Sequence, residues 1–374
     1  MYYLKLFQNH SEYEAEKTSG LELPNVSHCI NEAEVHYNPI TDYSKRHFAT
    51  VAREDGTISF NIWKSMGTDM IASISYSTDD GATWTTTQNQ DNKSEHLSIT
   101  VNVSEGDKIL WKGDAQQTGY YDVDDYYDYV GSFFSSTCEF DAQGNVMSLL
   151  YGDNFEDETT FEYAGQFCCL FGDYDGELEC KVVNANKLVL PATTLTSSCY
   201  YYMFKGCTSL VTAPELPATA LAHACYSYMF KGCTSLVNAP QLPTTTLATY
   251  CYQDMFWNCT SLVNAPELPA TTLVNSCYNS MFRGCTSLVN APQLPATTLA
   301  SGCYSSMFYG CTHLNYIKAM FTTTPSGSSP NYYTQNWVSG VAASGTFVKN
   351  SAATWNVSGV NGIPNGWTVE TASV

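Results

Sequence analysis

A repeat of 26 residues constrains this chain more than any other feature of its sequence. The segment from Cys199 to Leu210 recurs at Cys225, Cys251, Cys277 and Cys303. Self-similarity at a fixed period of this length is typical of architectures in which each unit packs only against its neighbours. A degenerate earlier copy, which ends in residues 186–195, precedes the regular ones, and we expect it to act as an atypical capping repeat.

The segment that follows the second cysteine of each repeat predicts a strand. Between Leu236 and Leu242, the even-numbered residues fall on one face and the odd-numbered ones on the other, which is the period of an extended chain. Its prolines limit ladder hydrogen bonding, so pairing is expected over residues 236–239 alone. The alternation places the equivalent residues Asn238, Asn264 and Asn290 inward, as a ladder between coils.

The segment between the two cysteines predicts a short helix. Cys225, Met229 and Cys233 recur at i, i+4 and i+8, and this spacing is that of an apolar helical stripe. The residue before the second cysteine is glycine in every regular repeat except one, which has Asn258. Asparagine is the non-glycine residue best able to adopt positive φ, so we expect positive φ here, at the end of the helix.

The core Met-Phe-x-Gly-Cys-Thr-Ser-Leu and the Leu-Pro pair that follows it carry a family resemblance. This core resembles the Ala-Phe-x-x-Cys-x-x-Leu core of the BspA-like (Treponema-type) leucine-rich repeats, although Met replaces Ala and the repeat is longer. The resemblance covers about residues 165–320. It implies a leucine-rich-repeat solenoid that serves adhesion or ligand binding, as in gut-bacterial surface proteins and phage-encoded relatives.

The region before the repeats predicts a small Ig-like β-sandwich, because alternating runs bounded by turn residues occur at 57–63, 71–76, 97–103 and 108–111. The expected fold class is therefore mostly β with short helices, a 26-residue leucine-rich-repeat solenoid preceded by this sandwich. The expected parts are an attachment segment with a strand and a capped helix (1–50), the sandwich (51–131), the solenoid (132–325) and a C-terminal cap (326–374).

The 15 cysteines raise the question of disulfides or metal. On the predicted helix, Cys199 and Cys207 would be about 12 Å apart, which is too far for a bond. The chain has no Cys-x-x-Cys pair and few histidines, which disfavours zinc. We expect the cysteines to be unpaired, buried and stacked in columns.

Two acidic motifs suggest alternative functions. The segment from Ser77 to Trp84 matches the Ser-x-Asp-x-Gly-x-Thr-Trp pattern of the sialidase Asp-box, which would make the protein a carbohydrate-active hydrolase. Such an enzyme needs an arginine cluster for a substrate carboxylate, and the chain has only Arg46, Arg53 and Arg283, so a structural hairpin is the favoured interpretation. No catalytic, cofactor-binding or metal residue is assigned.

A calcium site is the second alternative. The carboxylates of Asp122, Asp124 and Asp128, with Asp173 and Asp175, could hold Ca²⁺ through their oxygens. Their spacing lacks the glycine and the closing glutamate of an EF-hand, so a solvated acidic loop is the favoured interpretation, and no cofactor is expected.

Two columns of outward residues are the predicted binding surface. One varies in residue type where its neighbours do not, and comprises Lys205, Lys231, Trp257, Arg283 and Tyr309. The other comprises Glu215, Gln241, Glu267 and Gln293. Aromatic and cationic side chains suit contacts with sugars or proteins, and the competing interpretation is ordinary solvated surface.

The net charge of −20 disfavours nucleic acid as a partner. The chain has no apolar stretch of 18 residues and no signal-peptide pattern after Met1, so membrane insertion is not expected. The sequence favours a non-enzymatic attachment protein, a head or tail fibre-like appendage of a phage virion, or an adhesin of the bacterial cell surface.

The expected partners are a host surface protein or glycan. On a virion, residues 1–50 would contact other virion proteins, and the protein could be a homotrimer. A virion structural or decoration subunit with no adhesive role is the remaining alternative.

Overall fold

The structure, a computed structural model, describes residues 42–62, 73–88, 97–113, 120–121, 129–130, 132–172 and 180–372. The chain divides into two compact units, Met1–Tyr43 and Ser44–Val374, and the description below concerns the second. The strand and capped helix predicted within the first 40 residues lie outside the described residues.

The second unit is mostly β, as predicted. One sheet has the strand order β11-β10-β1-β6-β3-β4, a second has the order β5-β2-β9, and β7 pairs with β8. The strands predicted at 57–63, 71–76, 97–103 and 108–111 are confirmed where the structure describes them. The bounds are β1 (Phe48–Ala52), β2 (Gly56–Ile62), β3 (Ser73–Ser77), β4 (Thr85–Gln88), β5 (Leu97–Val103), β6 (Lys108–Gly113), β7 (Tyr120–Tyr121), β8 (Tyr129–Val130), β9 (Ser132–Ser136), β10 (Phe140–Asn145) and β11 (Val182–Val189).

Aromatic side chains join the two larger sheets. The ring of Phe134, on β9, lies 5.3 Å from the rings of Phe48 on β1 and Trp111 on β6, and 4.7 Å from that of Phe60 on β2. All four side chains are fully buried. Alternation along each strand puts these rings on one side, so the sheets share an apolar core.

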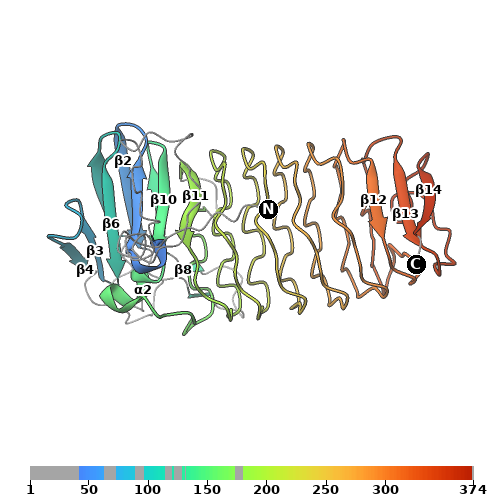
Figure 1. Cartoon of the computed structure of the whole chain (residues 1–374), viewed down its shortest axis with the longest axis horizontal. Helices are drawn as coiled ribbons and strands as arrows, with labels where there is room; N and C mark the ends of the chain where they lie inside the picture. The colour runs from blue at the N-terminus through green and yellow to red at the C-terminus, as the bar shows by residue number, and fades with distance from the viewer. Residues whose placement is uncertain are drawn as a thin grey trace, which may run out of the picture. The chain divides into compact units, whose positions relative to one another are not determined.

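Each of the two larger sheets combines strands from more than one of the parts predicted from the sequence. β1 spans the boundary at residue 50, while β9 and β10, which follow the boundary at residue 131, pair with β2 and β1. β10 also pairs in parallel with β11, which begins the degenerate copy. The Ala185 N–H then donates to the Thr212 carbonyl of the next repeat at 2.9 Å. β11 thus connects the six-stranded sheet to the regular repeats (Figure 1).

The prediction of a short helix between the two cysteines of each repeat is wrong. Residues 224–233 form overlapping turns instead, in which each odd-numbered N–H from Cys225 to Cys233 donates to the carbonyl three residues earlier. The even-numbered N–H groups donate to the next repeat, as from Phe230 to Met255 at 2.9 Å and from Gly232 to Trp257 at 2.7 Å. Half of the N–H groups thus join successive repeats, and an α-helix would keep them within its own segment.

Positive φ at every fourth residue produces this path. In the second repeat the three positions are Ala224 (φ 51°), Tyr228 (φ 59°) and Gly232 (φ 77°). The expected positive φ at Asn258 is confirmed at 61°, but it marks the last of three such positions and not a helix end. Turns of four residues give buried side chains at i and i+4, the spacing from which we predicted a helix.

Two columns of stacked rings fill the interior of the repeats. One runs through Phe204, Phe230, Phe256, Phe282 and Phe308, with centroids 5.5 to 5.9 Å apart. The other runs through the tyrosines from Tyr200 to Tyr304 in the same way, with centroids 5.6 to 6.1 Å apart. Because every regular repeat contributes the same two rings, each ring finds equivalent neighbours on both sides.

The described cysteines are all unpaired and buried, as predicted, and Cys29 lies outside the described residues. The second thiol of each repeat has a specific partner, because the Cys259 Sγ donates to the Phe230 carbonyl at 3.0 Å and the other repeats copy this contact. Burial raises the pKa of the Cys311 thiol to about 12. A small side chain with a weak donor suits this column, because the thiol adds a second hydrogen bond to a carbonyl that already accepts one from a backbone N–H.

The segments after the second cysteine in the first four regular repeats are extended but pair only at isolated bridges, such as Asn238 with Asn264 and Asn290 with Tyr316. Leu236 and Leu242 are buried, as the alternation predicted. The inward placement of the asparagines is wrong, because Asn238, Asn264 and Asn290 are exposed. The ladder itself exists, since the Asn264 side-chain amide donates to the Asn238 side-chain oxygen at 2.6 Å.

The C-terminal residues continue the repeats with a different sequence. The Trp337 ring lies 6.3 Å from Tyr304 and 6.2 Å from Phe308, so it closes both ring columns. Beside it, β12 (Tyr316–Ala319), β13 (Thr346–Asn350) and β14 (Thr368–Ala372) form a parallel sheet.

Helices are few among the described residues. They are α2 (Ser148–Tyr151) and the 3-10 turns η1 (Tyr43–Lys45) and η2 (Gly152–Asn154). None of them approaches the length or apolar character that a membrane-crossing helix requires.

Candidate binding surface

The first predicted column lies on the outer side of the turns. Each residue precedes the last positive-φ position of its repeat and follows the buried phenylalanine, so its side chain points away from the ring columns. Tyr309 is exposed and the others are half-buried. We call this set the cation–aromatic column: Lys205, Lys231, Trp257, Arg283 and Tyr309.

The structure brings the members of the cation–aromatic column into contact with one another. Lys231 Nζ lies 3.7 Å from the centroid of a Trp257 ring, and Arg283 Cζ lies 4.9 Å from it. The same guanidinium lies 4.8 Å from the Tyr309 ring. Since Lys231 comes from the preceding repeat and Arg283 from the following one, cations lie on both sides of Trp257.

Tyrosines at an adjacent position extend this contact network. Lys205 Nζ lies 4.6 Å from the Tyr202 ring, and Lys231 Nζ lies 5.2 Å from the Tyr228 ring. The rings of Tyr202 and Tyr228 are 4.8 Å apart. Sequence reasoning missed these two residues, because a tyrosine in a predicted helix gives no sign that it has positive φ.

Asp254 takes the place of those tyrosines in the third repeat. Its carboxyl is buried, and desolvation raises its pKa, while Gln253, Tyr228, Lys231 and Arg283 oppose that shift. Burial of an acid beside two cations is costly unless they offset the lost hydration. Desolvation shifts the pKa of Lys231 in the opposite direction, and so lowers it, because burial disfavours the charged ammonium group.

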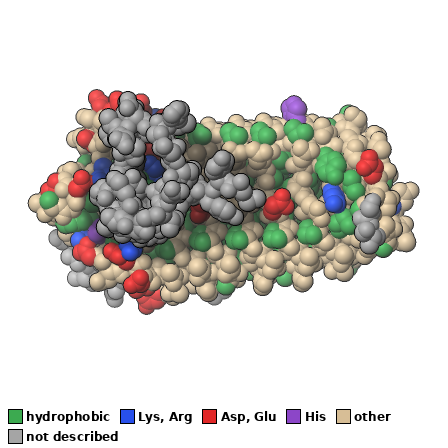
Figure 2. Space-filling model, viewed as in Figure 1, with side chains coloured by type: hydrophobic (Ala, Val, Ile, Leu, Met, Phe, Trp, Pro, Cys, Tyr) green, Lys and Arg blue, Asp and Glu red, His purple; other side chains and the backbone are tan. Residues whose placement is uncertain are grey.

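The second predicted column, Glu215, Gln241, Glu267 and Gln293, is also exposed. It belongs to the extended segments, which also expose Val211, Val237, Val263 and Val289. Figure 2 shows apolar side chains arranged in regular rows across these repeats. A shallow hollow of about 370 Å³ lies between the Pro-rich segments of two repeats and is lined by Glu215, Gln241 and neighbouring prolines. The two predicted columns are thus on different segments of each repeat.

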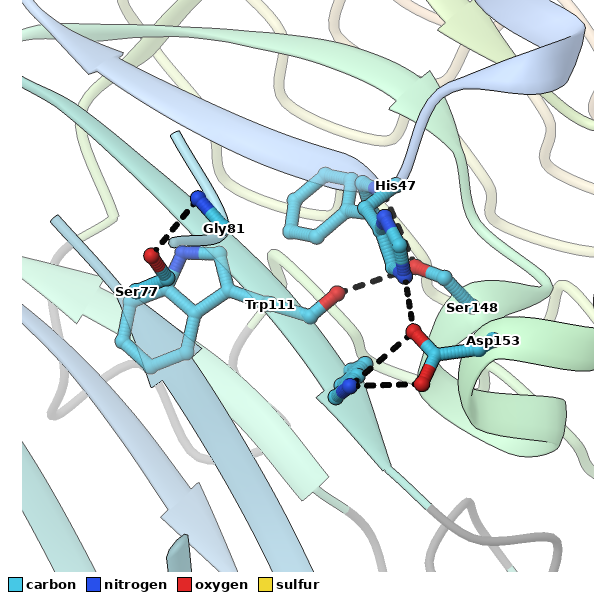
Figure 3. Close-up of polar contacts among 8 residues, drawn as sticks. His47, Ser77, Gly81, Trp111, Ser148 and Asp153 are labelled. Carbon is cyan, nitrogen blue, oxygen red and sulfur yellow. Dashed lines mark hydrogen bonds and ion pairs between the residues drawn. The ribbon is translucent and has the colours of Figure 1, made fainter. Parts of the chain in front are cut away.

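The Asp-box segment forms the turn between β3 and β4. The Asp79 carboxylate accepts hydrogen bonds from the Thr83 hydroxyl at 2.6 Å, the Thr83 N–H at 2.9 Å and the Ser77 hydroxyl at 2.7 Å. These bonds lower the pKa of Asp79 to about 2. Ser77 also accepts from the Gly81 N–H at 2.9 Å (Figure 3). The segment therefore forms a hairpin turn, which is the conformation favoured from the sequence.

A histidine, an aspartate and a lysine that sequence reasoning missed meet beside this hairpin (Figure 3). Asp153 contacts His47 Nε2 at 2.8 Å and accepts two hydrogen bonds from Lys112 Nζ at 2.8 and 2.9 Å. The nearby Ser148 hydroxyl is buried and donates to the Trp111 carbonyl at 2.9 Å while it accepts from the Phe48 N–H. These contacts join β1, β6 and η2, so they stabilise the sheet end.

The predicted calcium ligands, Asp122, Asp124 and Asp128, lie outside the described residues, as do Asp173 and Asp175. Within the described ranges, no group of three or more His, Cys, Asp or Glu side chains is arranged to hold a metal ion.

The chain matches no protein-family model, no curated protein and no solved structure. The ligand chemistry of this surface is therefore inferred from its own residues. On their turns, the repeats present a line of cations held between aromatic rings. On their extended segments, they present a line of amides, carboxylates and valines.

Proposed function

We propose that this protein is a non-enzymatic binding protein that attaches to a host-cell protein or glycan through the cation–aromatic column. The observation that carries the proposal is the contact of Lys231 and Arg283 with Trp257 from both sides. Large aromatic and cationic side chains with restricted motion are the residue types that dominate binding energy at interfaces. The phenylalanine before each column residue is the same in all five regular repeats and is buried, whereas the column residue itself differs between repeats and lies at the surface.

The proposal takes the repeats as a leucine-rich-repeat solenoid of the BspA-like type and the two sheets as an Ig-like sandwich that supports it. Hydrogen bonds between equivalent residues of successive repeats support the first part, and so do the two ring columns. In a solenoid each repeat contacts only its neighbours, and side chains at one position form a line suited to extended ligands.

The setting we propose is an appendage on the surface of a phage particle, with a bacterial adhesin as the alternative. The composition supports an exposed protein, because charged residues are only 14% while Tyr, with 27 copies, and the small hydroxyl residues supply much of the polarity. Residues 1–50 would then dock on other virion proteins, and the repeats would contact the host.

The test is binding of the labelled full chain to a panel of gut-bacterial cells. Replacement of Trp257, Arg283 and Tyr309 together by Ala should reduce binding about tenfold or more, because these side chains are the proposed contact residues. The matched control replaces Thr245, Thr271 and Thr297 by Ala, which are exposed and equally spaced on another segment. Equal binding by both variants, with unchanged melting curves, would exclude the cation–aromatic column as the binding surface.

A further inference from the structure

The charges of the regular repeats are separated by position. Between residues 196 and 315, the only lysines and arginines are Lys205, Lys231 and Arg283, and all of them belong to the cation–aromatic column. The acidic residues of the same range are Glu215 and Glu267, on the extended segments, and the buried Asp254. A protein with a net charge of −20 thus carries a locally positive line along its turns.

Lys231 and Arg283 are held by rings, and the acidic group that interacts with them is the buried Asp254. Among the described residues, ion pairs occur at His47, Arg53, Lys108 and Lys112, and none involves Lys231 or Arg283. A guanidinium stacked between two rings keeps its N–H donors at its edge, where a planar anion can bind them. Stacking therefore orients Arg283 without neutralising its charge.

Trp257 cannot act as a stacking platform in this arrangement. Lys231 and Arg283 approach it from the preceding and following repeats, so its faces are turned toward them and not toward a ligand. A ligand would meet ring edges and cationic groups. The surface is thus better suited to an anion than to the apolar face of a neutral sugar.

The residues around the line favour a polar polymer over a peptide. Between residues 196 and 340, the large apolar side chains exposed outside the extended segments are tyrosines, Tyr250, Tyr309 and Tyr332, whereas the exposed valines are on the extended segments. Recognition of an amphipathic helical peptide needs a hydrophobic groove. Beside the line lie hydroxyl and amide groups instead, including Tyr228 and Gln253, joined by a 3.2 Å hydrogen bond.

We infer that the ligand is a linear acidic polysaccharide that lies along the repeats, with its carboxylate or sulfate groups paired with Lys231 and Arg283 and reaching Lys205. The inference rests on the proposed function and specifies its ligand. Neighbouring strands are spaced about 4.8 Å apart, and one sugar unit of an extended chain has a similar length. Successive sugars can therefore follow successive repeats, and anionic groups on alternating units reach Lys231 and Arg283, which are two repeats apart.

The experiment measures binding of the full chain to polygalacturonate, dextran sulfate, neutral dextran and poly-glutamate by biolayer interferometry. The first two probes distinguish carboxylate from sulfate, and the last is the acidic peptide alternative. Lys231→Gln combined with Arg283→Gln removes two charges and keeps most of each side chain's length. Lys187→Gln combined with Lys318→Gln removes two charges from β11 and β12 as a matched control.

We expect at least one acidic polysaccharide to bind, neutral dextran not to bind, and affinity to fall steeply with added salt because the contacts are ionic. The Lys231/Arg283 variant should lose about tenfold or more in affinity, and the Lys187/Lys318 variant should change little. Preferential binding of poly-glutamate, or equal loss in both variants, would overturn the polysaccharide assignment. Cell binding that still depends on Trp257, Arg283 and Tyr309 in that case would leave the proposed function standing.

Discussion

The sheets and the repeats use charged side chains in opposite ways. In the sheets, Arg53 pairs with Asp141, Lys108 with Asp80, and Lys112 and His47 with Asp153. In the repeats, Lys231 and Arg283 contact rings instead of forming ion pairs, and the buried Asp254 is the acidic group beside them. Under the proposed function, position along the chain separates structure from binding: the sheet charges fix the ends of strands, and the repeat charges would face a partner.

The interiors differ as well. The sheet core is an irregular cluster around Trp111 and Phe134, whereas each ring of the repeats stacks on identical neighbours. Irregular cores depend on one fit among unlike side chains. A repeated core transmits a defect to both neighbouring repeats, because the same ring contacts two others.

The largest effect is expected from a gap in a ring column. Phe256→Ala should destabilise the protein by about 3–5 kcal/mol, because it removes a fully buried ring and leaves a cavity between Phe230 and Phe282. Phe256→Leu should lower the free energy of unfolding by less than Phe256→Ala does. Chemical denaturation measures both, and a loss below about 1 kcal/mol for Phe256→Ala would mean that the repeats close over the gap.

A smaller effect is expected at the last positive-φ position. Asn258→Val should cost on the order of 1–2 kcal/mol, because a β-branched residue resists the φ of 61° found here. Asn258→Gly should be neutral or slightly stabilising, since the other regular repeats have glycine at this position. Thermal melts compare the two, and indistinguishable curves would contradict the turn geometry.

The smallest effect is expected at Asp254 and depends on pH. Desolvation holds its folded-state pKa above the ordinary value of 3.8, so folding favours the protonated form. The contribution of Asp254 to stability is then greatest below the unfolded-state pKa and is lost as the pH rises through the folded-state pKa. Asp254→Asn should therefore raise the melting temperature at pH 7 and change it little near pH 3. A decrease at pH 7 would show that Lys231 and Arg283 outweigh desolvation.

The same substitution sharpens the contrast between the two regions. Removal of the carboxylate beside Lys231 and Arg283 makes the cation–aromatic column more positive, so Asp254→Asn should bind acidic polysaccharide more tightly than the unsubstituted chain. Asp141→Asn in the sheets, which breaks the pair with Arg53, serves as the control and should leave binding unchanged.

Sequence reasoning worked where a physical rule has one structural outcome. The period of 26, the strands at 57–63 and 97–103, and the positive φ at Asn258 were predictable because alternation and glycine replacement have few other causes. It failed where two structures share one pattern. The i, i+4 spacing of Cys225, Met229 and Cys233 arises equally from a helix and from turns of four residues.

Other features could not be predicted because they depend on distant segments. His47 and Asp153 are 106 positions apart, and neither residue alone indicates a pair. The contacts of Trp257 were equally hidden, because a column of outward residues predicts proximity but not which ring face each cation covers. The exposure of Asn238 could not be predicted from the alternation, which correctly places Leu236 and Leu242 of the same face inside.

The central claim is that binding belongs to the repeats and that the sheets are a scaffold. The most direct measurement compares two charge-matched variants of the full chain, Lys231→Gln with Arg283→Gln and Arg53→Gln with Lys108→Gln, for binding to bacterial cells and for thermal stability. The account predicts that the repeat variant loses about tenfold or more in binding and melts normally. It predicts that the sheet variant binds normally and melts slightly earlier, because it loses surface ion pairs. Lost binding in the sheet variant alone would contradict the account and move the binding surface to the sheets.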